Sequence, residues 1–73
     1  MTGKGYAKRL LGSYGNSWVV FECGRRVAIV TIRRAWLSEQ RRILNQMGYR
    51  VKSGYTEVKG QLLRELLSRE IVK

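Results

Sequence analysis

The amino-acid sequence predicts a small α+β domain in which antiparallel β-hairpins pack against two helices. Strand-forming residues flank glycine-containing turns over 17–32 and again over 49–58. Apolar residues recur at helical spacing over 34–47 and over 60–72. A chain of 73 residues supports only one hydrophobic core, so we expect residues 1–73 to form a single domain.

Residues 1–16 are expected to form a loose basic arm at the N-terminus rather than a regular element. Glycine loses more backbone freedom on folding than any other residue, and it therefore disfavours helices and strands. The segment contains four glycines and three cations, which are Gly3, Gly5, Gly12, Gly15, Lys4, Lys8 and Arg9.

Residues 17–32 are predicted to form a β-hairpin with Gly24-Arg25 as its two-residue turn, because glycine suits the first central position of such a turn. This turn fixes the register and places Val20 opposite Ile29. Both faces of the two strands are then apolar, as expected for a sheet that is covered on two sides.

Residues 34–47 are predicted to form a helix that ends before Gly48. Its apolar residues lie on one arc that includes Trp36, and we expect Trp36 and Trp18 to be core residues. The opposite side carries a polar stripe of Arg34, Ser38, Arg41 and Asn45. Arginine and asparagine suit base edges in a major groove, but no helix-turn-helix spacing accompanies the stripe. Solvent or phosphate contact is therefore the favoured interpretation.

Residues 49–58 are predicted to form a second, shorter hairpin about Ser53-Gly54, and the alternative is a helix that begins at Thr56. The final helix, over 60–72, places five apolar residues on one face: Leu62, Leu63, Leu66, Leu67 and Ile71. We expect this face to complete the core. The alternative is an exposed face for self-association or for a partner.

The composition argues against an enzyme. The chain has no histidine, no aspartate and a single cysteine, which excludes the commonest general base, internal disulfides and cysteine-rich metal sites. We expect a non-enzymatic protein without metal or cofactor. The enzymatic alternative is a ribonuclease-like activity of Arg, Lys and Tyr. It would need Glu22, Glu39 or Glu57 as its base, and none of these has a visible partner.

Two further features predict where the protein works. No apolar run exceeds four residues, so the sequence predicts no membrane span. A free cysteine without an export signal is typical of a reducing cytoplasm. We expect a cytoplasmic monomer.

The strongest functional signal is positive charge. The formal net charge is +10, and residues 1–52 contain eleven of the fifteen basic side chains but only two acidic ones. A charge of this size favours a polyanionic partner, and RNA or DNA backbone is the expected one. The candidate binding residues are Lys4, Lys8, Arg9, Arg25, Arg26, Arg33, Arg34, Arg41, Arg42, Arg50 and Lys52.

Aromatic side chains near this charge could stack on the bases of a single strand. Tyr14 and Tyr55 lie next to glycines, and we expect these two, rather than the tryptophans, to be exposed for stacking. The glycine and aromatic run of RNA-recognition sheets is absent.

The chain resembles the compact transcription regulators of lytic Xanthomonas phages that bind host RNA polymerase. The resemblance is carried by the length of 73 residues, the charge of +10, the single cysteine, the lack of histidine and the Met-Thr-Gly-Lys-Gly start. It implies docking on the largest polymerase subunit near the RNA exit channel, with inhibition of host promoter use and suppression of termination. No motif aligns residue by residue, so the resemblance assigns no site residues.

We therefore expect a phage-type transcription regulator that binds bacterial RNA polymerase close to nucleic acid. The alternative is a free-standing DNA- or RNA-binding protein of architectural or repressor type.

Overall fold

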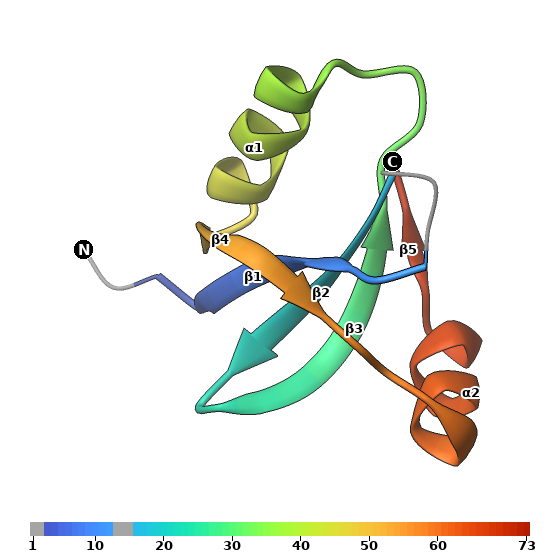
Figure 1. Ribbon diagram of the computed structural model, residues 1–73. Helices are drawn as coiled ribbons and strands as arrows, with labels where there is room; N and C mark the ends of the chain where they lie inside the picture. The colour runs from blue at the N-terminus through green and yellow to red at the C-terminus, as the bar shows by residue number, and fades with distance from the viewer. Residues whose placement is uncertain (1–2, 13–15) are drawn as a thin grey trace.

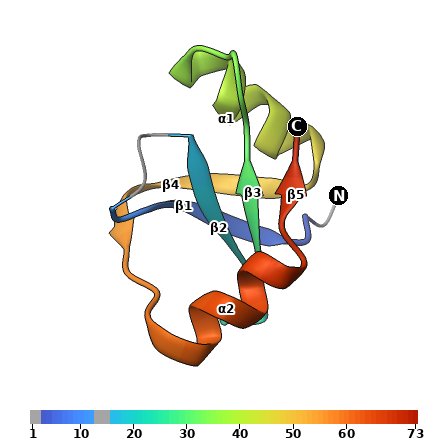
Figure 2. The ribbon, with the colours of Figure 1, turned by 90° about the vertical axis from the view of Figure 1, so that its right-hand side faces the viewer.

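The computed structural model describes residues 3–12 and 16–73, which form a five-stranded mixed sheet between two helices (Figures 1 and 2). The elements are β1 (Gly5–Leu10), β2 (Ser17–Glu22), β3 (Arg25–Thr31), α1 (Leu37–Gln46), β4 (Tyr49–Thr56), α2 (Gly60–Ser68) and β5 (Ile71–Val72). The strand order is β4-β1-β2-β3-β5. The predicted α+β class is confirmed, although both outer strands join the sheet in parallel. Tyr14, a predicted stacking residue, lies outside the described ranges.

Each face of the sheet has its own hydrophobic core, because side chains alternate along the strands. α1 covers the face that carries Ala7 and Trp18, and Leu44 packs there. α2 covers the opposite face, where Leu66 packs with Val19. Figure 2 shows the two helices on opposite sides of the strands, so the predicted two-sided coverage of the sheet is confirmed.

The N-terminal segment belongs to the sheet. The prediction of a loose arm over 1–16 is wrong, because residues 5–10 form β1, which lies between β4 and β2. Ala7 is completely buried, and the Tyr6 ring stacks on the Phe21 ring with 4.5 Å between centroids. Burial of these alternating side chains outweighs the backbone entropy that the glycines lose.

The hairpin over 17–32 is confirmed, but its turn is Cys23-Gly24, one residue earlier than predicted. Both turn residues have positive φ, 53° and 75°, as a type I′ turn requires. The earlier turn places Arg26 opposite Phe21, two residues from the predicted partner. A bulge between Val20 and Phe21 then leaves Val20 paired with Ala28, one residue from the predicted Ile29.

The prediction of a second hairpin over 49–58 is wrong. The segment forms a single strand, β4, which pairs with β1 in parallel. Ala7 pairs with Val51 and Arg9 pairs with Tyr55, so β4 uses two more residues than β1 between these pairs. Gly54, with a φ of 91°, lies in this bulge. Its left-handed conformation therefore serves a bulge, where the sequence suggested a turn.

The first helix is shorter than predicted, and this exposes a tryptophan. α1 begins at Leu37, and Arg34 has a left-handed φ of 58°, so the segment before Leu37 does not follow the helical period. The prediction that Trp36 is a core residue is wrong, since its side chain is 79% exposed. The same prediction for Trp18, which is 1% exposed, is confirmed.

The C-terminal helix also ends early. α2 stops at Ser68, and residues 71–72 form β5 beside β3. Leu66 is fully buried and Leu63 packs against the same core, so the helix completes the core as predicted. The other three residues of the predicted face, Leu62, Leu67 and Ile71, are 37%, 47% and 36% exposed. No helix within the described ranges is long and apolar enough to cross a membrane.

Leu66→Ala is expected to lower the free energy of unfolding by about 2–5 kcal/mol. The substitution removes most of a fully buried side chain from the core beneath α2. Leu62→Ala, on the same helix but partly exposed, is the matched control and is expected to cost clearly less. Urea denaturation measures both variants, and equal losses would contradict the described packing of Leu66.

Tyr49 gives the fold a pH-dependent contact. Its hydroxyl donates a hydrogen bond to Oε2 of Glu22 at 2.7 Å. Burial, together with the nearby Glu22 carboxylate, raises the pKa of Tyr49 from 10.0 to about 12. Because the folded pKa is the higher one, the stabilisation is complete below pH 10 and is lost as the pH rises towards 12.

We therefore expect wild type to lose stability between pH 10 and 12 more steeply than Tyr49→Phe, which has no phenol to ionise there. The free energy of unfolding of the two proteins, measured across this pH range, gives the comparison. Parallel pH profiles would contradict the assignment of the ionisation to Tyr49.

Candidate nucleic-acid interface

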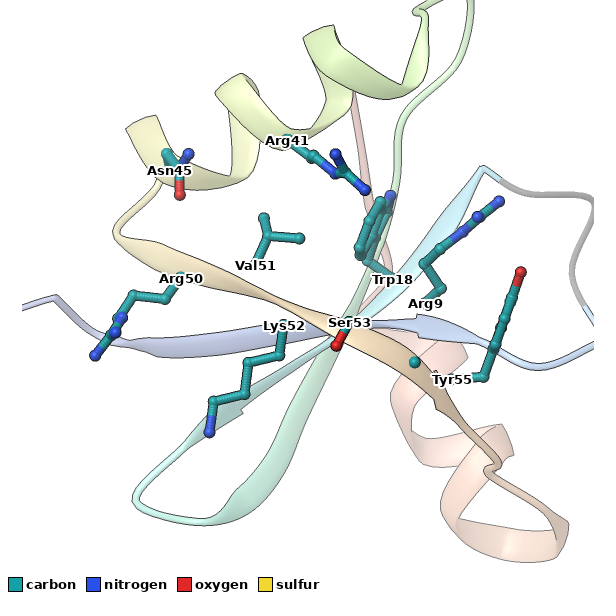
Figure 3. Close-up of a pocket in the computed structure, with 10 residues that line it drawn as sticks. Arg9, Trp18, Arg41, Asn45, Arg50, Val51, Lys52, Ser53 and Tyr55 are labelled. Carbon is teal, nitrogen blue, oxygen red and sulfur yellow. The ribbon is translucent and has the colours of Figure 1, made fainter.

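A groove of about 610 Å³ lies between α1 and β4 on the face of the sheet that α1 covers (Figure 3). α1 contributes Arg41 and Asn45 to one wall, and Arg50–Tyr55 of β4 form the other. Trp18 of β2 and Arg9 of β1 complete the lining. No acidic side chain lines the groove, so we call it the basic groove.

Arg9 is held between two aromatic rings. Its guanidinium carbon lies 5.9 Å from the Trp18 ring centroid and 5.3 Å from the Tyr55 ring centroid. Strand pairing explains the arrangement, because Arg9 pairs with Tyr55 on one side and with Trp18 on the other. Cation–π attraction stabilises a cation in this position, and Nε of Arg9 is buried without a hydrogen-bond partner among the described residues.

The floor of the basic groove is fixed by a buried hydrogen-bond chain. Nε1 of Trp18 donates to Oε1 of Gln40 at 2.7 Å, and Nε2 of Gln40 donates to the carbonyl oxygen of Ala35 at 3.1 Å. Gln40 is 4% exposed. The chain satisfies the buried indole N–H and ties α1 to β2, which holds Trp18 in place at the floor of the groove.

A second hollow, of about 340 Å³, lies near the other face of β4 and is lined by Gly3, Gly5, Tyr6, Arg50 and Lys52. Nζ of Lys52 lies 4.1 Å from the Tyr6 ring centroid, and Tyr6 stacks on Phe21 with 10° between the ring planes. Arg50 and Lys52 line both hollows, because the edge strand β4 separates them. We call this second site the Tyr6 hollow.

Four of the eleven predicted cations line the basic groove: Arg9, Arg41, Arg50 and Lys52. The side chains of Arg50 and Lys52 point away from α1 (Figure 3). The predicted stacking residue Tyr55 also lines the groove and is 56% exposed. The helix stripe of the sequence analysis is divided, since Arg41 and Asn45 line the groove whereas Arg34 lies before α1 in another hollow with Ala35 and Trp36.

The other seven predicted cations do not line the basic groove: Lys4, Lys8, Arg25, Arg26, Arg33, Arg34 and Arg42. Arg25 lies at the tip of the hairpin, and Arg42 is exposed on α1. Arg26 crosses the face opposite the groove, with its guanidinium carbon 5.5 Å from the Phe21 ring centroid and Nη2 donating to Oγ1 of Thr56 at 3.5 Å. The basic groove is therefore lined by only part of the predicted set of cations.

Two residues of the interface have roles that sequence reasoning missed. Trp18 is a core residue and also the floor of the basic groove. Tyr6 forms the second hollow, although its segment was predicted to be loose. Residues 6–10, Tyr-Ala-Lys-Arg-Leu, do not alternate between apolar and polar side chains, so no local pattern indicates β1.

Within residues 3–12 and 16–73, no group of three or more histidine, cysteine, aspartate or glutamate side chains is placed to hold a metal ion. Comparison of the chain with known protein families, with curated proteins and with solved structures finds no match.

Proposed function

We propose that this protein is a non-enzymatic nucleic-acid-binding protein and that the basic groove is its contact surface. The observation that carries the proposal is convergence: Arg9 of β1 and Arg41 of α1 line one hollow with the exposed ring of Tyr55. Arg50 and Lys52 lie along the β4 edge of the same hollow. Phosphates supply the negative charge that such a hollow lacks, and guanidinium groups bind them with a planar fork of donors.

The groove also offers polar contacts that a phosphate-only surface does not need. The Asn45 amide and the Ser53 hydroxyl line the same hollow as the cations. Amides and hydroxyls can bond to bases, sugars or phosphates, and the nearby guanidinium groups keep the backbone of the ligand in place. These groups suit the binding and positioning of a strand.

Fluorescence anisotropy with a labelled oligonucleotide tests this proposal. If four cations contact phosphates, the logarithm of the affinity is expected to fall with the logarithm of salt concentration at a slope between about −2.8 and −3.6. Arg41→Ala is expected to reduce the slope, whereas Arg64→Ala, an equal charge loss on α2 outside the groove, changes it less. Absence of binding at low salt, or equal effects of the two variants, would contradict the proposal.

A polymerase-directed transcription regulator is the second candidate, and one observation favours it. Trp36 is 79% exposed and lines a hollow of about 330 Å³ with Arg34 and Ala35. Tryptophan and arginine are enriched among the residues that dominate the energy of protein interfaces. We propose this surface, before α1, as the contact with RNA polymerase that the resemblance to phage regulators implies.

A pull-down from bacterial lysate separates the two candidates. Retention of polymerase subunits after complete nuclease digestion would support the second candidate, and its loss in Trp36→Ala would assign the contact. Disappearance of polymerase after digestion would leave nucleic-acid binding as the function. Arg64→Ala is again the control, because Arg64 is exposed on α2 and lines no part of the Trp36 hollow.

A further inference from the structure

We propose that the ligand of the basic groove is a single strand, which stacks a base on Tyr55 and then crosses the edge of β4 into the Tyr6 hollow. This inference rests on the proposed function, and it adds the class of nucleic acid and the path that it follows. It depends on three observations. Tyr55 is exposed but supported by Arg9, the two hollows share Arg50 and Lys52, and the polar side chains of α1 line the groove opposite β4.

Tyr55 is built as a stacking platform. The Arg9 guanidinium lies 5.3 Å from its ring centroid, and the Trp18 ring lies beyond Arg9, so the tyrosine is supported from the side of the sheet. More than half of the residue is nevertheless exposed. A tyrosine that is held in place and open to solvent suits an unpaired base, because every base offers a flat π-face. The bases of a duplex are stacked on one another and cannot reach it.

The two hollows share their cations. Arg50 and Lys52 line both sites, and Figure 3 shows their side chains pointing away from α1, whereas Arg41 and Trp18 lie on the α1 side. β4 is an outer strand of the sheet, so nothing else in the described sheet covers its free edge. Phosphates that round this edge would remain next to Arg50 and Lys52 throughout.

The Tyr6 hollow, on one side of β4, has the same kinds of side chain as the basic groove on the other side. In the basic groove a guanidinium lies over Tyr55, and in the Tyr6 hollow the Lys52 ammonium lies 4.1 Å from the Tyr6 ring centroid. Tyr6 stacks on Phe21, whereas Arg9 is both the cation at Tyr55 and the group that supports it. Each side therefore pairs one cation with one supported aromatic ring, which is the combination that single-strand sites use.

A duplex fits this geometry poorly. Turning round the edge of one β-strand requires a sharp bend within a few base pairs, which is costly for duplex DNA because its persistence length is about 150 base pairs. The polar residues of α1 do not offer a reading face for a major groove either, because Arg41 and Asn45 line a groove whose other wall is β4. A flexible single strand meets neither obstacle.

The first test compares strands of the same sequence as single-stranded RNA, single-stranded DNA and duplex DNA, at matched salt. A site that contacts only phosphates would favour the duplex, whose charge is denser. We expect single strands to bind at least about 10-fold more tightly than the duplex. Tighter binding of single-stranded RNA than of single-stranded DNA would indicate a 2′-hydroxyl contact, for which Asn45 and Ser53 are the candidates. Equal binding of single-stranded RNA and DNA would assign the affinity to bases and phosphates. Both results support a single-strand site.

The second test assigns the stacking residue. Tyr55→Ala is expected to weaken single-strand binding about 10-fold and to leave the weak duplex binding unchanged, while Tyr55→Phe retains the affinity. Trp36→Ala removes another exposed aromatic residue outside both hollows and serves as the control. Tighter duplex binding, or an equal loss of single-strand affinity in Tyr55→Ala and Trp36→Ala, would overturn the assignment.

The third test follows the path of the strand by photo-crosslinking of halogenated uridine oligonucleotides. A strand of about 12 nucleotides is expected to crosslink to Tyr55 and to Tyr6, and one of about 4 nucleotides to only one of them in each molecule. Crosslinks of the long strand that never include Tyr6 would overturn the crossing of β4. Failure of every nucleic acid to bind would instead overturn the proposed function, and with it this inference.

Discussion

Gly5→Ala is expected to abolish folding at 25 °C. A Cβ atom on residue 5 would lie 1.7 Å from the carbonyl oxygen of Phe21 and 2.8 Å from its carbonyl carbon. Both atoms belong to the backbone of β2, which is fixed by hydrogen bonds to β1 and β3, so a change of rotamer cannot relieve the contact. Overpacking by a methyl group typically costs about 1–3 kcal/mol, and a backbone collision in the central sheet exceeds that range.

Gly12→Ala is the matched control, because a Cβ atom at that position meets nothing within 4 Å. Its φ of 89° makes alanine unfavourable there, and we expect a loss of about 1 kcal/mol. Circular dichroism and urea denaturation of the two variants measure the difference. A folded Gly5→Ala protein of near wild-type stability would show that the β1–β2 contact differs from the one described.

The largest effect on binding is expected from the pair Arg41→Glu and Arg50→Glu. Both side chains are exposed, so the fold is expected to survive, but two phosphate contacts become repulsive. Hydrogen bonds to charged groups contribute about 1.5–3 kcal/mol each, which corresponds to a loss of affinity of about 10²- to 10⁴-fold for the pair. The salt slope for a single strand is expected to become shallower by about 1.4.

The control is the pair Arg64→Glu and Arg69→Glu, which changes the net charge by the same amount outside both hollows. These two arginines lie on α2 or directly after it. Anisotropy titrations over a range of salt concentrations compare the two double variants. Equal losses of affinity would mean that the total charge of the protein governs binding and that the basic groove does not.

Local patterns in the sequence predicted the elements whose partners lie nearby in the chain. The hairpin of β2 and β3 is such a case, as are the two helices, because alternation and helical periodicity are visible within a short window. Their exact limits were missed where a single residue departs from the pattern. Arg34 takes a left-handed conformation, so the helix cannot begin at residue 34 and starts only after Trp36. Arginine has no intrinsic preference that would predict this conformation.

The parallel pairing of β1 with β4 could not be predicted in this way. It joins residues about 45 positions apart, and the local sequence of neither strand indicates that the other is its partner. Ser53-Gly54 predicts a turn in the sequence, but glycine with positive φ serves turns and bulges alike. The choice depends on whether β1 is available as a neighbour, which is a property of the whole fold.

The candidate site inherits this limit. The sequence predicts that arginines and Tyr55 meet a polyanion, since charge and residue type are read directly. The sequence does not show which arginines lie close together in the fold. That depends on the β1–β4 pairing, which places Arg9 beside Tyr55. The division of the helix stripe, with Arg41 in the groove and Arg34 outside it, depends likewise on where α1 begins.

The central place of β1 has a consequence for the newly made chain on the ribosome. β1 can pair with β2 soon after both are synthesised, but its other edge stays open until β4 has emerged. At usual rates of translation, the ribosome needs roughly 2–9 s to extend the chain from Leu10 to Thr56. Charged side chains on an open strand hinder pairing with strands of other molecules, and β1 carries Lys8 and Arg9. We therefore expect Arg9 to hinder such pairing in the nascent chain before its guanidinium packs between the Trp18 and Tyr55 rings of the folded protein.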